Sequence, residues 1–152
     1  AGLSRGPADD VRAFLTPVGS VGVAVCLDGF YRSVLDRLDG EGAQVVVQPS
    51  ANHASWERPW PADGRLREGE AWLQRGLRAQ IQDRLSIRYG VNPMMVGDLW
   101  DLQARGRSSL VGNRRYVRAA CEGYAGVLAL ARTSDQEEVV RARVSLPAMH
   151  MI

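Results

Sequence analysis

The sequence predicts an α/β fold with a mixed sheet, because short apolar strands and an amphipathic helix alternate near its amino-terminal end. Two apolar runs, residues 21–25 and 43–47, have the length of strands that are buried on both faces. Between these runs, apolar side chains recur at helical spacing: Phe30, Tyr31, Val34, Leu35 and Leu38. A strand, a helix and a strand within about 30 residues predict a right-handed parallel βαβ unit.

Local signals at the ends of this unit support its boundaries. The stretch 17–20, rich in Pro and Gly, predicts a turn between residues 11–16 and the first strand. Asp28 stands where the N-cap of the helix is expected, and Gly40 and Gly42 supply its stop. The helix is therefore expected to begin directly after the first strand.

A long loop and a second helix are expected next. Residues 50–64 form a loop rich in Trp, Pro and His, and long loops at strand ends often carry function. A helix is expected over residues 66–84, with Leu73, Leu77 and Ile81 on one face.

Alternating apolar residues predict the remaining strands. Ile87, Tyr89 and Val91 alternate with polar residues or glycine, which predicts a strand with one covered face. Two further strands are expected at residues 108–111 and 127–131. In a last strand, residues 139–146, we expect inward-facing apolar residues to alternate with outward-facing arginines, namely Val140, Ala142 and Val144 with Arg141 and Arg143.

Composition excludes several classes of function. The 152 residues, 45% hydrophobic and 24% charged, have the profile of a single globular domain over residues 1–152. A net charge of +2 gives no large field of one sign, so nucleic acid is disfavoured as a partner. No apolar run approaches the roughly 20 residues of a membrane span, and the first residues lack a signal-peptide pattern. We therefore expect a cytoplasmic protein with no membrane partner, whose two cysteines remain thiols.

The basic residues limit the chemistry further. All 19 residues counted as Lys or Arg are arginines, so Schiff-base chemistry and Walker-type phosphate loops are excluded within this chain. Arg114, Arg115 and Arg118, around Tyr116, are expected to form a solvated turn rather than a phosphate site. The histidines and cysteines do not fall at zinc spacings, and we predict no metal and no cofactor.

Cys26 is the sharpest candidate for a reactive group. It stands at the carboxyl end of the first predicted strand, and open α/β sheets bind ligands outside the carboxyl ends of their strands. Backbone N–H groups at the start of the following helix would favour a thiolate and an oxyanion there. The alternative is a buried structural cysteine, because free cysteine is among the most buried residue types.

His53 is the second candidate. It follows the neighbouring strand by a few residues, and adjacent strands lie about 4.8 Å apart, so Asn52 and His53 could reach the Cys26 thiol. A Cys–His pair is one way to generate a thiolate nucleophile. The alternative is a histidine that lines a pocket or faces solvent.

Three segments taken together resemble the nitrilase (carbon–nitrogen hydrolase) superfamily. Residues 14–19, residues 21–28 (Val-Gly-Val-Ala-Val-Cys-Leu-Asp) and residues 45–52 (Val-Val-Val-Gln-Pro-Ser-Ala-Asn) are similar to its strand ending in the nucleophilic cysteine, followed by a helix and a strand ending in Pro-Ser-Ala. The resemblance continues through residues 73–84, 89–92, 106–110 and the closing strands.

The resemblance implies one nitrilase-like domain that lacks its amino-terminal half. The complete fold is a four-layer α-β-β-α sandwich whose site uses a Glu general base, a Lys and the Cys nucleophile. Cys26 matches the nucleophile, the backbone N–H of Leu27 an oxyanion donor, and Asp28 the acid of the motif. The Glu and Lys lie upstream in the family and have no matching positions here. Arg32-Ser33 also departs from the Pro-Glu of many members.

The function implied by the resemblance is hydrolysis of an amide or nitrile C–N bond through a Cys26 thioester, without a cofactor. Asn52, His53 and Trp56 are expected to line the pocket for a small amide or nitrile. The implied partners are the missing amino-terminal half or a further copy in a homo-oligomer. Without a base and a lysine, the isolated chain is expected to be inactive. A non-catalytic interaction module derived from the same fold is the alternative.

Overall fold

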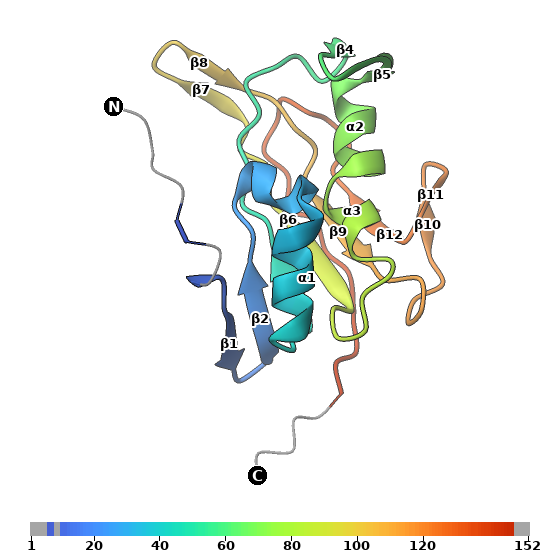
Figure 1. Ribbon diagram of the computed structural model, residues 1–152. Helices are drawn as coiled ribbons and strands as arrows, with labels where there is room; N and C mark the ends of the chain where they lie inside the picture. The colour runs from blue at the N-terminus through green and yellow to red at the C-terminus, as the bar shows by residue number, and fades with distance from the viewer. Residues whose placement is uncertain (1–5, 8–9, 148–152) are drawn as a thin grey trace.

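A six-stranded mixed sheet forms the centre of the molecule, in a computed structural model that describes residues 6–7 and 10–147 (Figure 1). The strand order is β1-β2-β3-β6-β9-β12. Neighbouring strands are parallel for β2–β3 and β3–β6 and antiparallel for the other pairs. The strands have these bounds: β1 Ala13–Thr16, β2 Gly19–Val23, β3 Val45–Val47, β6 Tyr89–Asn92, β9 Ser109–Gly112 and β12 Val127–Leu130.

The predicted βαβ unit is confirmed. β2 and β3 are parallel, and helix α1 (Arg32–Gly40) connects them. Leu35 and Leu38 of α1 are buried against the sheet, as their helical spacing predicts, whereas Tyr31 is exposed. The helix stops at Gly40 as expected.

The predicted cap of α1 is wrong. A separate 3₁₀ turn, η2 (Cys26–Phe30), precedes the helix, and the N-cap residue of α1 is Tyr31. The Asp28 carboxylate instead accepts the Val25 N–H at 3.1 Å, so it stabilises the turn that carries Cys26. Asp side chains readily accept hydrogen bonds from nearby backbone N–H groups. Here the Asp28 carboxylate does so in the η2 turn that precedes α1, and not at the start of α1 itself.

The second predicted helix exists but is broken. It consists of α2 (Glu68–Arg75) and α3 (Leu77–Gln80), separated by Gly76 in an extended conformation. A Cβ at Gly76 would lie 2.6 Å from the Trp72 carbonyl oxygen, so the close approach of the two helices requires glycine. Leu73, Leu77 and Ile81 form the buried face that the sequence predicts.

The strands expected near residues 108–111 and 127–131 are confirmed as β9 and β12. In β6, however, the helix-facing residue is Gly90, because an added Cβ there would meet Leu77 at 2.7 Å. The predicted strand is confirmed, and its predicted covered face, that of Tyr89 and Val91, lies on the side away from the helices, where Tyr89 is buried and Val91 is half-buried. β6 is a central strand of the sheet, so both of its faces are covered to some degree and alternation alone does not identify the helix side.

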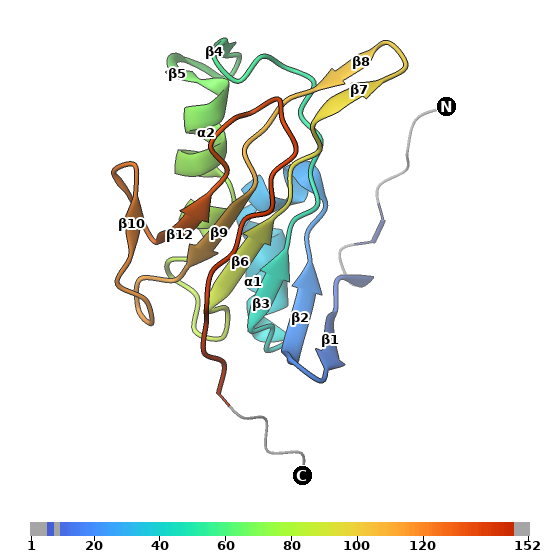
Figure 2. The same ribbon diagram turned by 180° about the vertical axis from the view of Figure 1, so that it is seen from behind.

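The predicted last strand is wrong. Residues 139–146 form no regular element, and the segment after β12 runs across a face of the sheet instead of pairing with an edge (Figure 2). The Tyr89 hydroxyl donates to the Ser145 carbonyl at 3.0 Å, which fixes the far end of the segment. Alternation of apolar and charged residues marks an extended chain, but it does not show whether that chain joins a ladder.

Three short hairpins project from the sheet and were not predicted. Their strands are β4 (Pro59–Trp60) with β5 (Asp63–Arg67), β7 (Gly97–Leu99) with β8 (Leu102–Ala104), and β10 (Ala120–Cys121) with β11 (Tyr124–Ala125). The expected turn around Tyr116 is confirmed, with Arg114 and Arg115 exposed. The described helices are not long and apolar enough to cross a bilayer.

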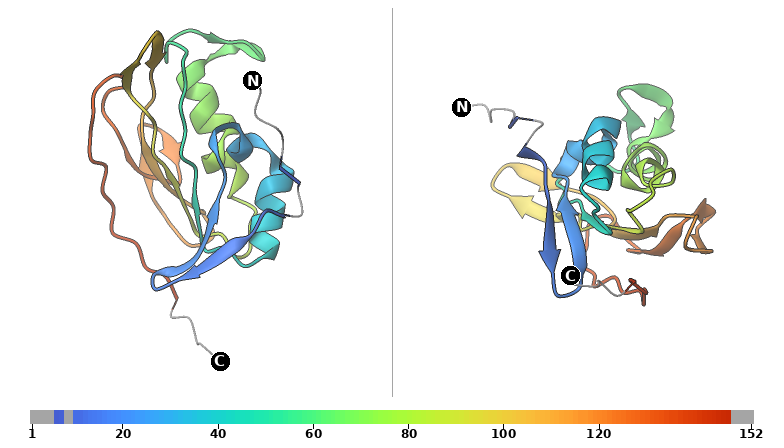
Figure 3. Two further views of the ribbon diagram at one scale, coloured as in Figure 1. Left: turned by 90° about the vertical axis from the view of Figure 1, so that its left-hand side faces the viewer. Right: turned by 60° about the horizontal axis from the view of Figure 1, so that its bottom comes forward.

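The helices all lie on one side of the sheet, and the segment after β12 lies on the other (Figure 3). The helix side holds the main core, built around Leu35, Leu38, Val46, Leu77 and Val111. The opposite side carries two registered rows of mostly apolar side chains, which we call the open face: Phe14, Val21, Val45 and Tyr89, then Val23, Val47, Val91 and Leu110. Phe14 is 60% exposed and Val23 45% exposed.

Candidate functional site

Cys26 opens the η2 turn just beyond the carboxyl end of β2, as the sequence predicts. Its backbone lies in the left-handed region, with φ of 50°. For a residue with a Cβ this conformation is uncommon and costs on the order of 1 kcal/mol or more, so the surrounding contacts must hold it. A strained, half-buried cysteine at a strand end is a candidate functional group.

Neighbouring residues of the β3 extension hold Cys26 in place. The Cys26 N–H donates to the Pro49 carbonyl at 2.9 Å, and the Gln48 side-chain amide donates to the Cys26 carbonyl. The thiol donates to the Ala51 carbonyl, with Sγ and O 3.5 Å apart. The peptide groups on both sides of the cysteine and its side chain are thus all bonded to residues 48–51.

Leu27 and Asp28 lie in the same turn. The Asp28 carboxylate bonds the Val25 N–H and so shapes the backbone on the amino-terminal side of Cys26. The Leu27 side chain is exposed, and its N–H has no acceptor among residues 6–7 and 10–147. A free backbone donor next to a thiol is the arrangement that an oxyanion site requires.

An apolar cluster lies beside the thiol. Trp56, Trp72 and Met94 form its buried centre, and Cys26 and Phe30 pack against it. The rings of Phe30 and Trp72 meet edge to face, with centroids 5.0 Å apart. The cluster joins the loop after β3, helix α2 and the η2 turn, so the surroundings of Cys26 combine apolar walls with backbone polar groups.

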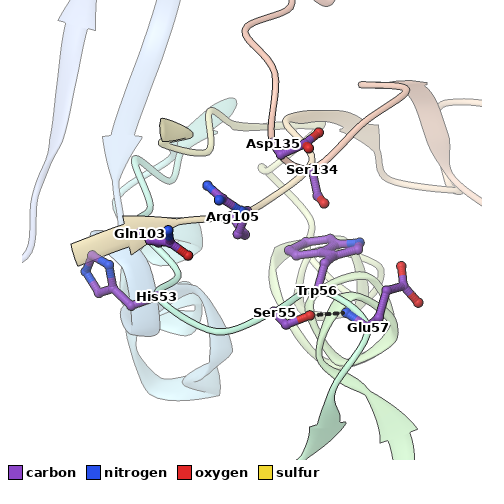
Figure 4. Close-up of a pocket in the computed structure, with 8 residues that line it drawn as sticks. All are labelled: His53, Ser55, Trp56, Glu57, Gln103, Arg105, Ser134 and Asp135. Carbon is purple, nitrogen blue, oxygen red and sulfur yellow. Dashed lines mark hydrogen bonds between the residues drawn. The ribbon is translucent and has the colours of Figure 1, made fainter. Parts of the chain in front are cut away.

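A pocket of about 340 Å³ opens next to this cluster (Figure 4). His53 and Trp56, which the sequence predicts as substrate-binding, both line it. Cys26 is not one of its lining residues. The other residues that line it are Ser55, Glu57, Gln103, Arg105, Ser134 and Asp135.

Asn52 lies outside this pocket and shapes the loop instead. Its buried side-chain amide donates to the carbonyls of Ala54 at 3.0 Å and Arg105 at 3.1 Å. His53 is exposed and makes no hydrogen bond or ion pair with the described residues, so it does not pair with Cys26 as the dyad hypothesis requires. Trp56, buried in the apolar cluster, is the residue that connects Cys26 to the pocket.

A second pocket of about 450 Å³ shares Trp56 with the first and is bordered by an ion pair. Arg107 donates two hydrogen bonds to the Glu122 carboxylate, at 2.8 and 2.6 Å. These bonds hold the pKa of Glu122 below its ordinary value, and they raise the pKa of Arg107. The pair ties the start of β9 to the β10–β11 hairpin.

Sequence reasoning missed Gln48 and most of the pocket wall. Gln48 directly follows the three valines of a buried strand. A polar residue at the end of such a strand was the signal in the sequence that could have indicated a role at the site. Gln103, Ser134 and Asp135 come from segments for which the sequence predicts no regular element, so nothing in their spacing placed them beside residues 53–57.

No protein-family model and no curated protein sequence matches the chain. Solved structures do match. A carbon–nitrogen hydrolase from Helicobacter pylori is similar over 86% of this chain and 41% of its own, with a TM-score of 0.63 and 23% identity. Nit3 of Saccharomyces cerevisiae, a nitrilase-superfamily member, is similar over 88% and 40%, with a TM-score of 0.58 and 20% identity. The NitN amidase of Nesterenkonia is similar over 95% and 44%, with a TM-score of 0.59 and 16% identity.

These likenesses establish the fold. The chain has the α/β fold of nitrilase-superfamily hydrolases, as its resemblance to that superfamily implies. It spans about two fifths of the length of the structures that it matches, namely 41%, 40% and 44% of the three chains.

Proposed function

We propose that this chain is the nucleophile-bearing part of a carbon–nitrogen hydrolase that cleaves small amides or nitriles. The observation that carries the proposal is the position of Cys26, held in a left-handed backbone conformation at the carboxyl end of β2 within this fold. One of the similar structures is an amidase with a product of acrylamide addition at its active-site cysteine, and another is a variant of that amidase in complex with butyramide.

The chemistry assigned to Cys26 has two stages. A base removes the thiol proton, and Sγ attacks the amide carbon; the C–N bond then breaks, and the nitrogen leaves as ammonia or an amine after taking up a proton. Water next attacks the thioester and releases the acid and the free thiol. The backbone N–H of Leu27 would stabilise the oxyanion in both stages, and one such donor is worth about 10²–10³ in rate.

The base and the lysine come from outside these residues in this proposal. The sequence contains no lysine, and the two side chains nearest in role, Asp28 and His53, form no hydrogen bond with the thiol. Asp28 acts on the turn, and not on the substrate. We assign the missing groups to the part of the fold that lies outside the match, supplied by the same polypeptide or by an associated chain.

The open face supports this assignment of a partner. Its two rows of mostly apolar side chains lie opposite the helices, and Phe14 and Val23 are largely uncovered. Apolar patches of this kind mark interaction sites. We propose that the remaining half of the fold packs on this face, and that complete protomers associate as a homo-oligomer.

The pocket beside Trp56 is the proposed site for the part of the substrate away from the scissile bond, because Cys26 is not one of its lining residues. His53 and Trp56 would line it directly, and Asn52 would hold the loop that carries both. No cofactor enters this chemistry. Two free thiols in the described chain, Cys26 and Cys121, agree with a reducing compartment, so we propose a cytoplasmic location.

The test compares two cysteine variants of the natural protein, purified with its associated chains. Ammonia release is measured with butyramide and a panel of short amides and nitriles. Cys26→Ala is expected to lower the rate by at least about 10³-fold, because the covalent route is lost. Cys121→Ala, the matched control, is expected to retain activity. Full activity of Cys26→Ala would overturn the proposal.

The open face also favours a second candidate, a non-catalytic interaction module that retains the fold but binds a partner through its sheet. This candidate predicts that the natural protein, with all associated chains, hydrolyses no member of the panel while still forming a complex through the open face. The same assay therefore separates the two candidates.

A further inference from the structure

Gln48 is a buried amide beside the cysteine for which neither the fold nor the sequence motif supplies a role. It follows β3 directly, its side chain is 0% exposed, and its N–H donates to the Val91 carbonyl at 2.7 Å. Its side-chain oxygen Oε1 is buried without a hydrogen-bond partner among the described residues. An unpaired buried oxygen of this kind is unfavourable by about 1–3 kcal/mol, which an apolar side chain would avoid.

The one hydrogen bond that the Gln48 side chain makes gives a reason for an amide, and not an apolar group, at this buried position. Gln48 Nε2 donates to the carbonyl of Cys26, which is itself the residue with left-handed φ. The Pro49 carbonyl accepts the Cys26 N–H, so residues 48 and 49 hold both sides of the cysteine. A strained backbone conformation persists where several surrounding contacts hold it in place, and these two hydrogen bonds are such contacts for Cys26.

Gly29 makes the Gln48 bond possible. A Cβ at Gly29 would lie 2.2 Å from Gln48 Nε2, far inside van der Waals contact. Gly29 is itself buried in the η2 turn, so this turn and the amide are fitted to each other. Here glycine is needed for close approach and not for a positive φ.

We propose that Gln48 is a positioning residue that holds the Cys26 backbone in its left-handed conformation and thereby directs the thiol toward Ala51. The proposal rests on the proposed function, since the direction of the thiol matters for catalysis only if Cys26 is the nucleophile. Without the Gln48 bond, the Cys26 carbonyl is released, the backbone relaxes toward negative φ, and Sγ leaves the Ala51 carbonyl.

Thiol labelling tests the proposal on the full chain without any substrate. Dithiodipyridine labelling, followed by peptide mass mapping, gives the rates for Cys26 and Cys121 in the same molecule. We expect Gln48→Leu to raise the Cys26-to-Cys121 rate ratio at least about threefold, because the released thiol becomes more accessible. Asn92→Leu, which removes a buried amide from the neighbouring strand end, is the matched control and is expected to leave the ratio unchanged.

Gln48→Glu separates positioning from a merely structural role. A protonated carboxyl can donate to the Cys26 carbonyl, whereas a carboxylate cannot. Between about pH 5 and pH 9 the ratio for this variant is expected to pass from the wild-type value to the Gln48→Leu value, since burial raises carboxyl pKa values into that range. The wild-type protein has no titratable group at position 48, so its ratio is expected to show no such step.

Gly29→Ala keeps the proposal testable if Gln48→Leu does not fold. This variant leaves Gln48 in place but displaces its amide, so it is expected to raise the ratio in the same direction. Unchanged ratios in all folded variants at Gln48 and Gly29 would overturn the proposal. Labelling requires no turnover, so a shifted ratio in a protein that hydrolyses no amide would refute the proposed function and leave the positioning role intact.

Discussion

The two faces of the sheet differ in how completely their apolar side chains are covered. On the helix side, the side chains of α1, α3, β3 and β9 close a dry core around Leu38, Val46 and Val111. On the open face, valines recur just as regularly along the strands but are only partly covered. The segment that covers them is extended, and its Ser145 carbonyl accepts a hydrogen bond from the Tyr89 hydroxyl. The same residue types thus form a closed core on one side of the sheet and a partly exposed apolar face on the other.

This difference bears on the site. Residues 48–51, which follow β3, and the η2 turn position Cys26, and the hydrogen-bond partner of its thiol is a backbone carbonyl and not a side-chain base. In the proposed function, the chain supplies an ordered position for the nucleophile, and a partner that packs on the open face supplies the base.

The largest expected effect compares truncation on the two faces. Leu38→Ala empties a fully buried position and is expected to lower the free energy of unfolding by about 2–5 kcal/mol. Val23→Ala on the open face is expected to lower it by less than about 1 kcal/mol in the same chain, because Val23 is 45% exposed. Urea unfolding followed by circular dichroism measures both. Equal losses would show that the open face is already a core.

A charge on the open face tests whether this surface associates. The isolated chain is expected to self-associate, since the uncovered rows are apolar. Val23→Asp is expected to raise the dissociation constant about tenfold or more, because a buried, unpaired carboxylate is unfavourable. Leu85→Asp is the matched control, at an apolar residue 65% exposed and outside the open face. Analytical ultracentrifugation measures both, and equal constants for the two variants would contradict the assignment.

The smallest expected effect is the acid-dependent loss of stability that comes from the Arg107–Glu122 ion pair. Because Arg107 lowers the folded-state pKa of Glu122 below 4.5, the pair stabilises the fold at pH above that value. This contribution is lost as pH falls through the lowered pKa. Glu122 is half exposed, so the contribution is at most about 1 kcal/mol.

Arg107→Gln should remove that part of the acid dependence. The measurement is the urea midpoint between about pH 6 and pH 3, compared with Arg115→Gln. Arg115 is exposed and forms no ion pair with the described residues, so this control should keep the wild-type acid profile. An unchanged slope for Arg107→Gln would contradict the role of the pair.

The spacing of apolar residues along the sequence predicted the helices whose side chains pack into the main core. Leu35 and Leu38 on α1, and Leu73, Leu77 and Ile81 on the broken second helix, lie where helical spacing places them. The break itself came from a contact between Gly76 and Trp72, which spacing does not reveal. Residues 139–146 have a strand pattern, yet they cross a face, because alternation reports extension and not pairing.

The site was predictable in part for a similar reason. Cys26 could be placed at a strand end because topology brings the carboxyl ends of parallel strands together. Gln48 could not be linked to it, since that bond depends on the missing Cβ of Gly29 and on a side chain folded back under the turn. The pocket wall at Gln103 and Ser134 depends on unpredicted segments.

The most direct test of the central claim is the mass of the Cys26 peptide from the natural protein, quenched in acid during turnover of butyramide. We expect an acyl group on Cys26 and none on Cys121, because the carbonyl carbon stays bonded to Sγ after ammonia leaves. Ammonia release that continues while Cys26 remains unmodified, and that survives Cys26→Ala, would contradict it.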